Sequence, residues 1–477
     1  MLSALKTNAL LLDEDDEKKV VNHIKHDINI QNTATYYSIA NSFKIFSLSK
    51  LLLDYMERCF TMVVDSHNFL ELGDMCVAKI LSSNKLNVDT ELEVLYAAVT
   101  WLNYNINERM KFAKYVLLKI RHPLISDHAL KDFFSNTSYF NSADDRTAVV
   151  NEVLQIKESV VINNSDTYYT NRYYSQKKFS IFLCGGCKSN SGSDVTEFSN
   201  LTFKIDMDTL KCREDIPMKS KRMSSKAVCI RGEVYVYGGY DENIKAVEAI
   251  EKYSLTTNSW KKVGEIYDDR NQFCCCALTT RMFIIGGILQ RSLDNRQFIV
   301  ENSCVAFDTV QEKCIKISDL RERRLDAACT VFEGKIIVLG GFNKDHSTSM
   351  KGVEAYDHVA DEWTQMPDMI QGRARDHRSV AIQNKMFVFG GGDSGQLSCE
   401  VFDSTCRKFV YLKSFPNLRR FWWPKKAFAV GNQIVAYYEK YILAYNVETG
   451  EWLEKSCKVL DVKDFTFAKV PELKAII

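Results

Sequence analysis

Proline is scarce in this sequence, and long hydrophobic runs and an excess of charge of one sign are absent. Only 6 of the 477 residues are proline, so each one is a strong signal for a helix end or a turn. The apolar runs extend over a few residues, which excludes a transmembrane helix. Lys and Arg number 62 against 61 Asp and Glu, which argues against a large basic surface for nucleic acid. We therefore expect neither a membrane nor a nucleic acid as a partner.

The sequence also lacks the features of an exported protein. Its first residues, MLSALKTNALLL, form an apolar stretch that is too short for a signal peptide, and the acidic segment DEDDE follows soon after. The 15 cysteines are odd in number and scattered along the chain. Without an export signal, reduced thiols are expected. The prediction is a cytoplasmic location, with the nucleus as an alternative.

From about residue 33 to residue 157 the apolar residues follow a helical spacing. Ser49 fits the start of one helix, and Thr90 begins a capping box for another whose buried face carries Leu95, Ala98, Val99 and Leu102. A last helix is predicted near residues 144–157, and a polar, Asn- and Ser-rich segment follows it. We therefore predict an N-terminal segment at 1–32, a helical domain at 33–158 and a linker at 159–178.

From residue 179 onward the sequence changes to short strands that repeat about every 50 residues. Five copies end in a glycine pair, at Gly185-Gly186, Gly238-Gly239, Gly286-Gly287, Gly340-Gly341 and Gly391-Gly392, and a sixth copy has Tyr437-Tyr438 instead. In phase with them, two apolar residues recur seven apart, as in Tyr253 and Trp260. Sheets of this kind stack radially because each cannot bury both faces alone.

These observations predict an α + all-β chain, in which an N-terminal helical domain precedes a six-bladed β-propeller at 179–477. The first repeat begins at its glycine-bearing strand and lacks a strand before it. The segment DFTFAKV near the C-terminus, with Phe465 and Phe467 alternating, is a candidate for that strand. The hypothesis is that this segment joins the first blade and closes the ring.

The double glycine followed by a spaced Tyr and Trp resembles the Kelch repeat. The segment LNVDTELEVLYAAVTWL at 86–102, followed by Arg109 and IRHPLIS at 120–126, resembles the BACK domain of Kelch-like (BTB–BACK–Kelch) proteins. The resemblance implies a non-enzymatic substrate-recognition adaptor of a cullin-type ubiquitin ligase, with target proteins bound on the propeller rim. A BTB domain has roughly 100 residues, and only 32 precede residue 33. The resemblance therefore implies a BTB domain that is absent or truncated.

A third repeated signal is an arginine 16 residues before the first glycine of a pair. It occurs at Arg222, Arg270, Arg324 and Arg375, and Arg420 lies one residue off this register. By the resemblance, these arginines lie on one rim with the residues after the glycines and bind a target peptide that is acidic or phosphorylated. Those residues are Tyr240, Asp241, Phe342, Asn343 and Asp393. The alternative is that the arginines cap loops and pair with neighbouring carboxylates.

The motifs of metal and catalytic chemistry are not apparent. Cys184 and Cys187 enclose a glycine pair and have no second pair at zinc spacing, and Cys274, Cys275 and Cys276 alternate faces along one strand. The sequence has no phosphate loop and no nucleophile elbow. We therefore predict no cofactor, no metal site and no catalytic residue. Two other functions stay open, a non-ligase scaffold such as an actin-associated Kelch protein and a BTB-less competitor that sequesters substrates.

Overall fold

The computed structural model divides the chain into a helical unit, residues 1–177 with 471–477, and a strand unit, residues 178–470. The structure describes residues 21–163 and 179–471. The exceptions are residues 23, 25–26, 65, 89–90, 126 and 136–138 in the first range, and 190–195, 208, 256, 269, 279, 291–297, 344–348, 359, 376, 383–384, 393–397, 405, 413–425, 431–432, 439–440, 457–461 and 464–465 in the second.

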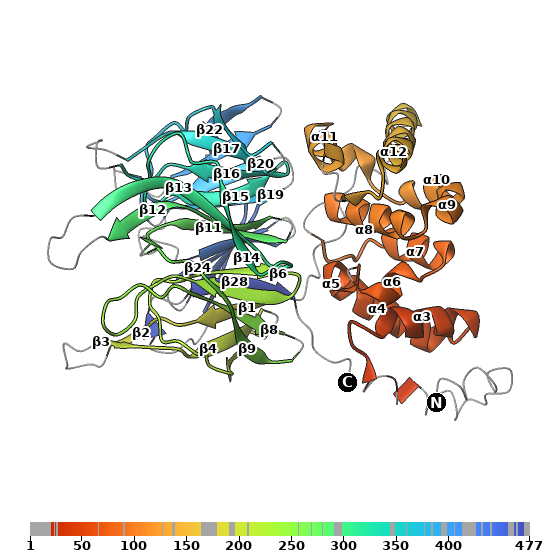
Figure 1. Ribbon diagram of the computed structural model, residues 1–477, viewed down its shortest axis with the longest axis horizontal. Helices are drawn as coiled ribbons and strands as arrows, with labels where there is room; N and C mark the ends of the chain where they lie inside the picture. Colours follow the sequence, from red (N-terminus) through yellow and green to blue (C-terminus); the bar gives the residue numbers. More distant parts are fainter. Residues whose placement is uncertain are drawn as a thin grey trace. The chain divides into compact units, whose positions relative to one another are not determined.

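The helical unit is a succession of short helices around one apolar core (Figure 1). Its α-helices are α3 (Thr33–Ser42), α4 (Phe46–Arg58), α5 (Phe60–Val64), α6 (His67–Leu70), α7 (Asp74–Leu81), α8 (Glu91–Tyr104), α9 (Ile106–Arg109), α10 (Ala113–Leu117), α11 (Asp127–Ser135) and α12 (Ala143–Asn163), with 3-10 turns η1 (Met110–Phe112) and η2 (His122–Leu124). In these described ranges, none of the helices combines the length and the apolar character needed to cross a membrane.

Helix α8 lies at the centre of this core. Leu95, Ala98, Val99 and Leu102, the predicted buried face, are all fully buried. The indole nitrogen of Trp101 donates a hydrogen bond to the Leu72 carbonyl at 2.8 Å. The Arg109 guanidinium lies 4.4 Å from the centre of the Trp101 ring and donates to the Trp101 and Leu70 carbonyls. This arginine therefore joins the end of α8 to the end of α6.

Two sequence expectations differ from the helical unit as observed, and a third is not tested. Ser49 does not begin a helix, because α4 starts at Phe46 and Ser49 lies buried inside it, where its hydroxyl donates to the Asn41 side chain at 2.9 Å. Helix α12 extends to Asn163, past the expected end of the domain at residue 158. Thr90, the expected cap of α8, lies outside the described residues.

The strand unit is a six-bladed β-propeller, as the repeats predicted. In order, its blades are β28–β1–β4–β5, β6–β7–β8–β9, β10/β11–β12–β13–β14, β15–β16–β17–β18, β19–β20–β21–β22 and β23–β24–β25–β26, and β27, β2 and β3 form a small additional sheet. The bounds in the first two blades are β28 (Thr466–Pro471), β1 (Phe179–Cys184), β4 (Thr202–Asp206), β5 (Cys212–Asp215), β6 (Lys226–Ile230), β7 (Glu233–Tyr237), β8 (Ala249–Ser254) and β9 (Ser259–Glu265).

The remaining strands follow the same antiparallel pattern. They are β10 (Arg270–Asn271), β11 (Cys274–Leu278), β12 (Arg281–Gln290), β13 (Phe298–Asp308), β14 (Lys313–Ile317), β15 (Ala328–Phe332), β16 (Lys335–Leu339), β17 (Val353–Asp357), β18 (Glu362–Met366), β19 (Arg378–Ile382), β20 (Lys385–Phe389), β21 (Cys399–Asp403), β22 (Lys408–Tyr411), β23 (Lys426–Val430), β24 (Gln433–Tyr438), β25 (Tyr441–Asn446), β26 (Trp452–Ser456), β2 (Cys187–Ser189), β3 (Thr196–Phe198) and β27 (Val462–Lys463). The strands β6, β11, β15, β19 and β23 contact one another in that order, so the first strand of each blade is the inner one.

The hypothesis of ring closure is confirmed, because β28 pairs with β1 and completes the first blade (Figure 1). Phe467 and Val470 of β28 are buried. The Phe467 ring lies 5.0 Å from the ring of Tyr437, which belongs to β24 in the sixth blade. One strand therefore joins the first blade by pairing and contacts the sixth by packing. Phe465 lies outside the described residues.

The residues seven apart fill the spaces between blades. Tyr356 and Trp363 pair across β17 and β18 with ring centres 5.0 Å apart, and Phe283 of the preceding blade lies 6.0 Å from Tyr356. The Trp363 indole also donates a hydrogen bond to the preceding blade, at the Ser318 carbonyl, with a distance of 2.8 Å. These aromatic positions serve packing between blades.

In four blades the glycine pair directly follows the second strand, whereas in the third blade Gly286-Gly287 lie inside β12 at a register shift. Both glycines of each pair have positive φ. The fifth pair is Gly390-Gly391, with φ of 79° and 66°, and not Gly391-Gly392 as the sequence suggested. Gly392 instead forms an isolated bridge with Arg373. In the fifth repeat the arginine that contacts the first glycine is Arg373, 17 residues before Gly390.

Candidate partner-binding surface

Three arginines in the loops between blades are buried and hydrogen-bonded to the propeller itself. Arg324 is 1% exposed. Its guanidinium contacts the Glu354 carboxylate at 2.6 Å and donates to the Gly340 and Gly352 carbonyls at 2.9 and 3.0 Å. Equivalent ion pairs join Arg222 to Glu251 at 2.6 Å and Arg373 to Glu400 at 2.9 Å. We call these three ion pairs the arginine clamps.

Each arginine clamp joins two neighbouring blades. The Arg324 side chain binds the fourth blade, whereas its own carbonyl accepts a hydrogen bond from the Gly287 amide of the third blade at 2.9 Å. The Glu354 carboxylate also accepts from the Arg321 amide at 2.8 Å and so fixes the loop. Because both charges of each pair are buried and paired with each other, the clamps belong to the propeller framework.

Arg270 is buried too, although its blade has no equivalent glutamate. Its guanidinium donates to the Gly286 and Ser303 carbonyls at 3.0 and 2.6 Å and pairs with Asp268 at 2.9 Å. For Arg222, Arg270 and Arg324, the structure therefore supports the alternative from the sequence analysis, in which these arginines cap loops and pair with carboxylates. Their side chains are not open to a target peptide, which corrects the expectation for these three positions.

Arg375 differs from the other predicted arginines. It is exposed, and at φ 47° it takes the left-handed conformation that Ser224, Gln272 and Asp326 take two residues after their arginines. Arg373 occupies the clamp position instead. Within the described part of the chain, the Arg375 side chain forms no hydrogen bond or ion pair, so its binding to a partner stays a prediction. Arg420 and Asp393 lie outside the described residues.

The loops that follow the glycine pairs lie against the arginine loops. Tyr240 forms an isolated antiparallel β-bridge with Met223, and Phe342 forms an equivalent β-bridge with Leu325. Tyr240 and Phe342 are half-buried, whereas Asn343 is buried. The Asp241 carboxylate accepts from the Asn243 and Lys245 amides at 2.9 Å and shapes its loop. Partner binding by these residues also stays a prediction.

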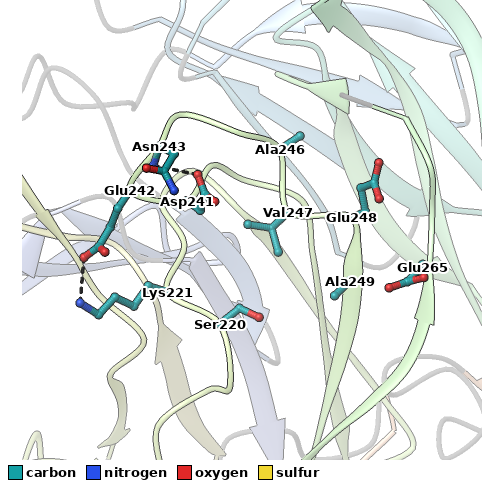
Figure 2. Close-up of a pocket in the computed structure, with 10 residues that line it drawn as sticks. All are labelled: Ser220, Lys221, Asp241, Glu242, Asn243, Ala246, Val247, Glu248, Ala249 and Glu265. Carbon is teal, nitrogen blue, oxygen red and sulfur yellow. Dashed lines mark hydrogen bonds and ion pairs between the residues drawn. The ribbon is translucent and has the colours of Figure 1, made fainter.

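A pocket of about 400 Å³ lies in the second blade, between the two kinds of loop (Figure 2). Its lining includes Ser220, Lys221, Asp241, Glu242, Asn243, Ala246, Val247, Glu248, Ala249 and Glu265. Lys221 pairs with Glu242 at 2.8 Å, and the pKa of Glu265 is lowered by its hydrogen bonds from Lys262 and Tyr267. With four carboxylates around it, this pocket suits a cationic group and does not suit the acidic peptide that we expected.

His377 lies buried between the fourth and fifth blades, where its Nε2 is 3.1 Å from the Ala328 amide and 2.9 Å from the Leu339 carbonyl. Burial, followed by the charges of Arg378, Arg373 and Arg324, lowers its pKa to about 3. The ring is therefore neutral in the folded propeller.

Acid is expected to weaken the propeller through His377. An unfolded histidine has a pKa of about 6.5, so between that pH and about 3 the unfolded chain binds a proton that the folded chain excludes. Stability then falls as the pH falls, by up to about 1.4 kcal/mol per pH unit. Urea unfolding measured between pH 7 and 4.5 gives the free energy of unfolding as a function of pH. This free energy should fall less steeply with falling pH for His377→Gln than for the wild type. His67→Gln, at an exposed histidine, should keep the wild-type slope; equal slopes for the wild type and both variants would contradict the assignment.

The cysteines that the structure describes are free thiols. Burial raises the pKa of Cys184 and Cys304. Cys274 and Cys276 lie with Cys329 in the packed interface between the third and fourth blades. Within the described residues, no group of three or more His, Cys, Asp or Glu side chains is arranged to hold a metal ion.

Two family models match the chain in the order of its two units. Residues 33–135 match the family described as "BTB And C-terminal Kelch". Residues 174–400 match the "KLHDC2/KLHL20/DRC7 Kelch-repeats domain". The expected truncation of a BTB domain concerns residues 1–32, most of which lie outside the described residues.

Curated relatives match across both units. Kelch-like protein 7 of Rattus norvegicus is 24% identical over 463 residues, which cover 93% of this chain and 74% of the relative. Kelch-like protein 26 of Danio rerio is 21% identical over 377 residues, which cover 77% of this chain and 52% of the relative. A third relative is the Kelch repeat and BTB domain-containing protein 3 of Mus musculus, 21% identical over 292 residues, covering 50% of this chain and 48% of the relative. With its helical unit, its six blades and these matches, the chain has a BACK-type region followed by Kelch repeats and is similar to Kelch-like proteins.

Proposed function

We propose that the chain is a substrate-recognition adaptor of a cullin-type ubiquitin ligase and that it acts in the cytoplasm. The observation that carries the proposal is the order of a BACK-type helical unit and a Kelch propeller, which the chain shares with Kelch-like relatives. In this proposal the propeller holds a target protein, and the ubiquitin-transfer chemistry belongs to other subunits.

On the propeller, the proposed contact surface is the rim around Arg375, Tyr240, Asp241 and Phe342, with the pocket of Figure 2 beside it. The clamp arginines support this surface from within and do not contact the target. Arg375 is the exposed cation among the four arginines that shared the sequence register. The carboxylate-lined pocket adds a place for a basic side chain of the target.

Affinity capture of the tagged full chain from cells tests the proposal. The expected result is co-purification of a cullin together with target proteins that become ubiquitinated. Arg375→Glu should lose targets and keep the cullin, whereas Lys385→Glu, at an exposed lysine of β20, should keep both. Retained partners without any cullin would overturn the ligase assignment and would favour a scaffold or a competitor that sequesters substrates.

A further inference from the structure

Three basic residues occupy the same position in three different blades. Lys226, Arg378 and Lys426 open the inner strands β6, β19 and β23. Lys226 and Arg378 pair with Tyr237 and Phe389, the residues just before the glycine pairs of their blades, and Lys426 pairs with Tyr437 at the same register of the sixth blade. The equivalent residues in the third and fourth blades are Cys274 and Ala328. We call the three basic residues the channel cation cluster.

The three residues open inner strands at the same register, so they lie at the same end of the channel around the propeller axis. The second and fifth blades lie opposite each other in a ring of six, yet Arg378 acts electrostatically on Lys226. Both of them also act on Lys426 of the sixth blade and, together with burial, lower its pKa to about 8. Interactions across a ring require side chains that extend from the inner strands into the central channel.

The two lysines of the cluster face few counter-charges among the described residues. Within the described residues, Asp326 is the carboxylate that acts on Lys226, and the thiols of Cys275 and Cys329 lie near both lysines. Arg378 donates to the His377 carbonyl at 2.7 Å. The ammonium groups of Lys226 and Lys426 have no hydrogen-bond acceptor in the described part of the chain. Like charges confined in a channel, where the effective dielectric constant is low, repel strongly unless an anion joins them.

We infer that this end of the channel binds an oxyanion of the phosphate type, held by Lys226, Lys426 and Arg378. A guanidinium offers two parallel donors to such an anion, and the ammonium groups add charge-assisted hydrogen bonds. The anion is either a free small ion or a phosphoryl group on a partner segment, which reaches the channel from the side of the arginine loops. The inference goes beyond the proposed function and holds whether or not the chain binds a cullin.

Thermal unfolding of the full chain tests the site with inorganic phosphate as the probe, against sodium chloride of equal ionic strength. At phosphate concentrations about 100-fold above the Kd, the wild-type Tm should rise by roughly 3–5 °C. The double variant Lys226→Gln, Lys426→Gln should lose this rise, and Lys385→Gln, at an exposed lysine on β20, should keep it. A rise of equal size in the double variant, or no rise in the wild type, would overturn the inference.

The chloride baseline separates binding from a structural role. Because the substitutions remove like-charge repulsion, the double variant should unfold at or above the wild-type Tm in chloride. Unfolding at a clearly lower Tm would mean that the lysines support the fold, and it would refute the site. A phosphoserine peptide that acts at tenfold lower concentration than phosphate would identify a partner segment as the source. Equal potency would identify a free anion. Cullin capture by the same variant should be unchanged, so failure of either proposal is seen independently.

Discussion

The substitution Arg324→Ala is expected to lower the free energy of unfolding of the propeller by about 3–5 kcal/mol. The change leaves the Glu354 carboxylate buried without its cation, and it removes one donor each from the Gly340 and Gly352 carbonyls. Urea unfolding followed by tryptophan fluorescence measures the loss, because Trp363 lies in the same blade as Glu354. Arg375→Ala, at an exposed arginine of the same kind of loop, should change the free energy by less than about 0.5 kcal/mol.

A double-mutant cycle with Glu354→Gln shows whether the loss comes from the ion pair. We expect the second substitution to add little in the Arg324→Ala background, because the carboxylate has then already lost its cation. Additive losses would mean that the two side chains act independently and that the clamp assignment is wrong. The same cycle on Arg222 and Glu251 provides a second, separate test in another blade.

The second large effect is expected at β28. Deletion of residues 466–477 removes the inner strand of the first blade and exposes the edge of β1, so the single cooperative unfolding transition of the propeller should be lost. The milder substitution Phe467→Ala should cost about 3–5 kcal/mol, because this buried ring packs on Tyr437 of the sixth blade. Circular dichroism and calorimetry report both changes.

The control for this deletion is a shorter one. Removal of residues 472–477 leaves β28 (Thr466–Pro471) in place, and a cooperative transition near the wild-type Tm is the expected result. If the longer deletion also unfolds in one sharp transition at the wild-type temperature, then β28 does not hold the ring closed.

The architecture could be predicted from the sequence because a blade repeats its own strand pattern. The glycine pairs and the residues seven apart are local signals, and six copies in phase define six blades without any knowledge of contacts. The closing strand was also visible, since the first repeat lacks a strand and DFTFAKV alternates as a strand should. Local periodicity was less reliable at Ser49, which is a good capping residue but does not begin its helix. Apolar residues before Ser49 allow the helix to start earlier, at Phe46.

The role of the arginines could not be predicted in the same way. Their glutamate partners lie on the third strand of the blade, at a separation that differs between blades because the intervening loops differ in length. In the fifth blade three consecutive glycines hid the true register, and the arginine lies 17 rather than 16 residues before the first glycine, so the sequence pointed to Arg375 in place of Arg373. The channel cation cluster was invisible for a related reason, since its residues are far apart in the chain and meet only when the ring closes.

The way the first blade is assembled has a consequence for synthesis of the protein. Strand β1 begins at Phe179 and its partner β28 ends at Pro471, so the ribosome makes nearly 300 residues between them. At about 5–20 residues per second, that interval lasts roughly 15–60 seconds. Throughout this time β1 has an unpaired edge that is open to chaperones or to a second nascent chain. A premature stop codon between β1 and β28 would leave every copy without the strand that pairs with this edge.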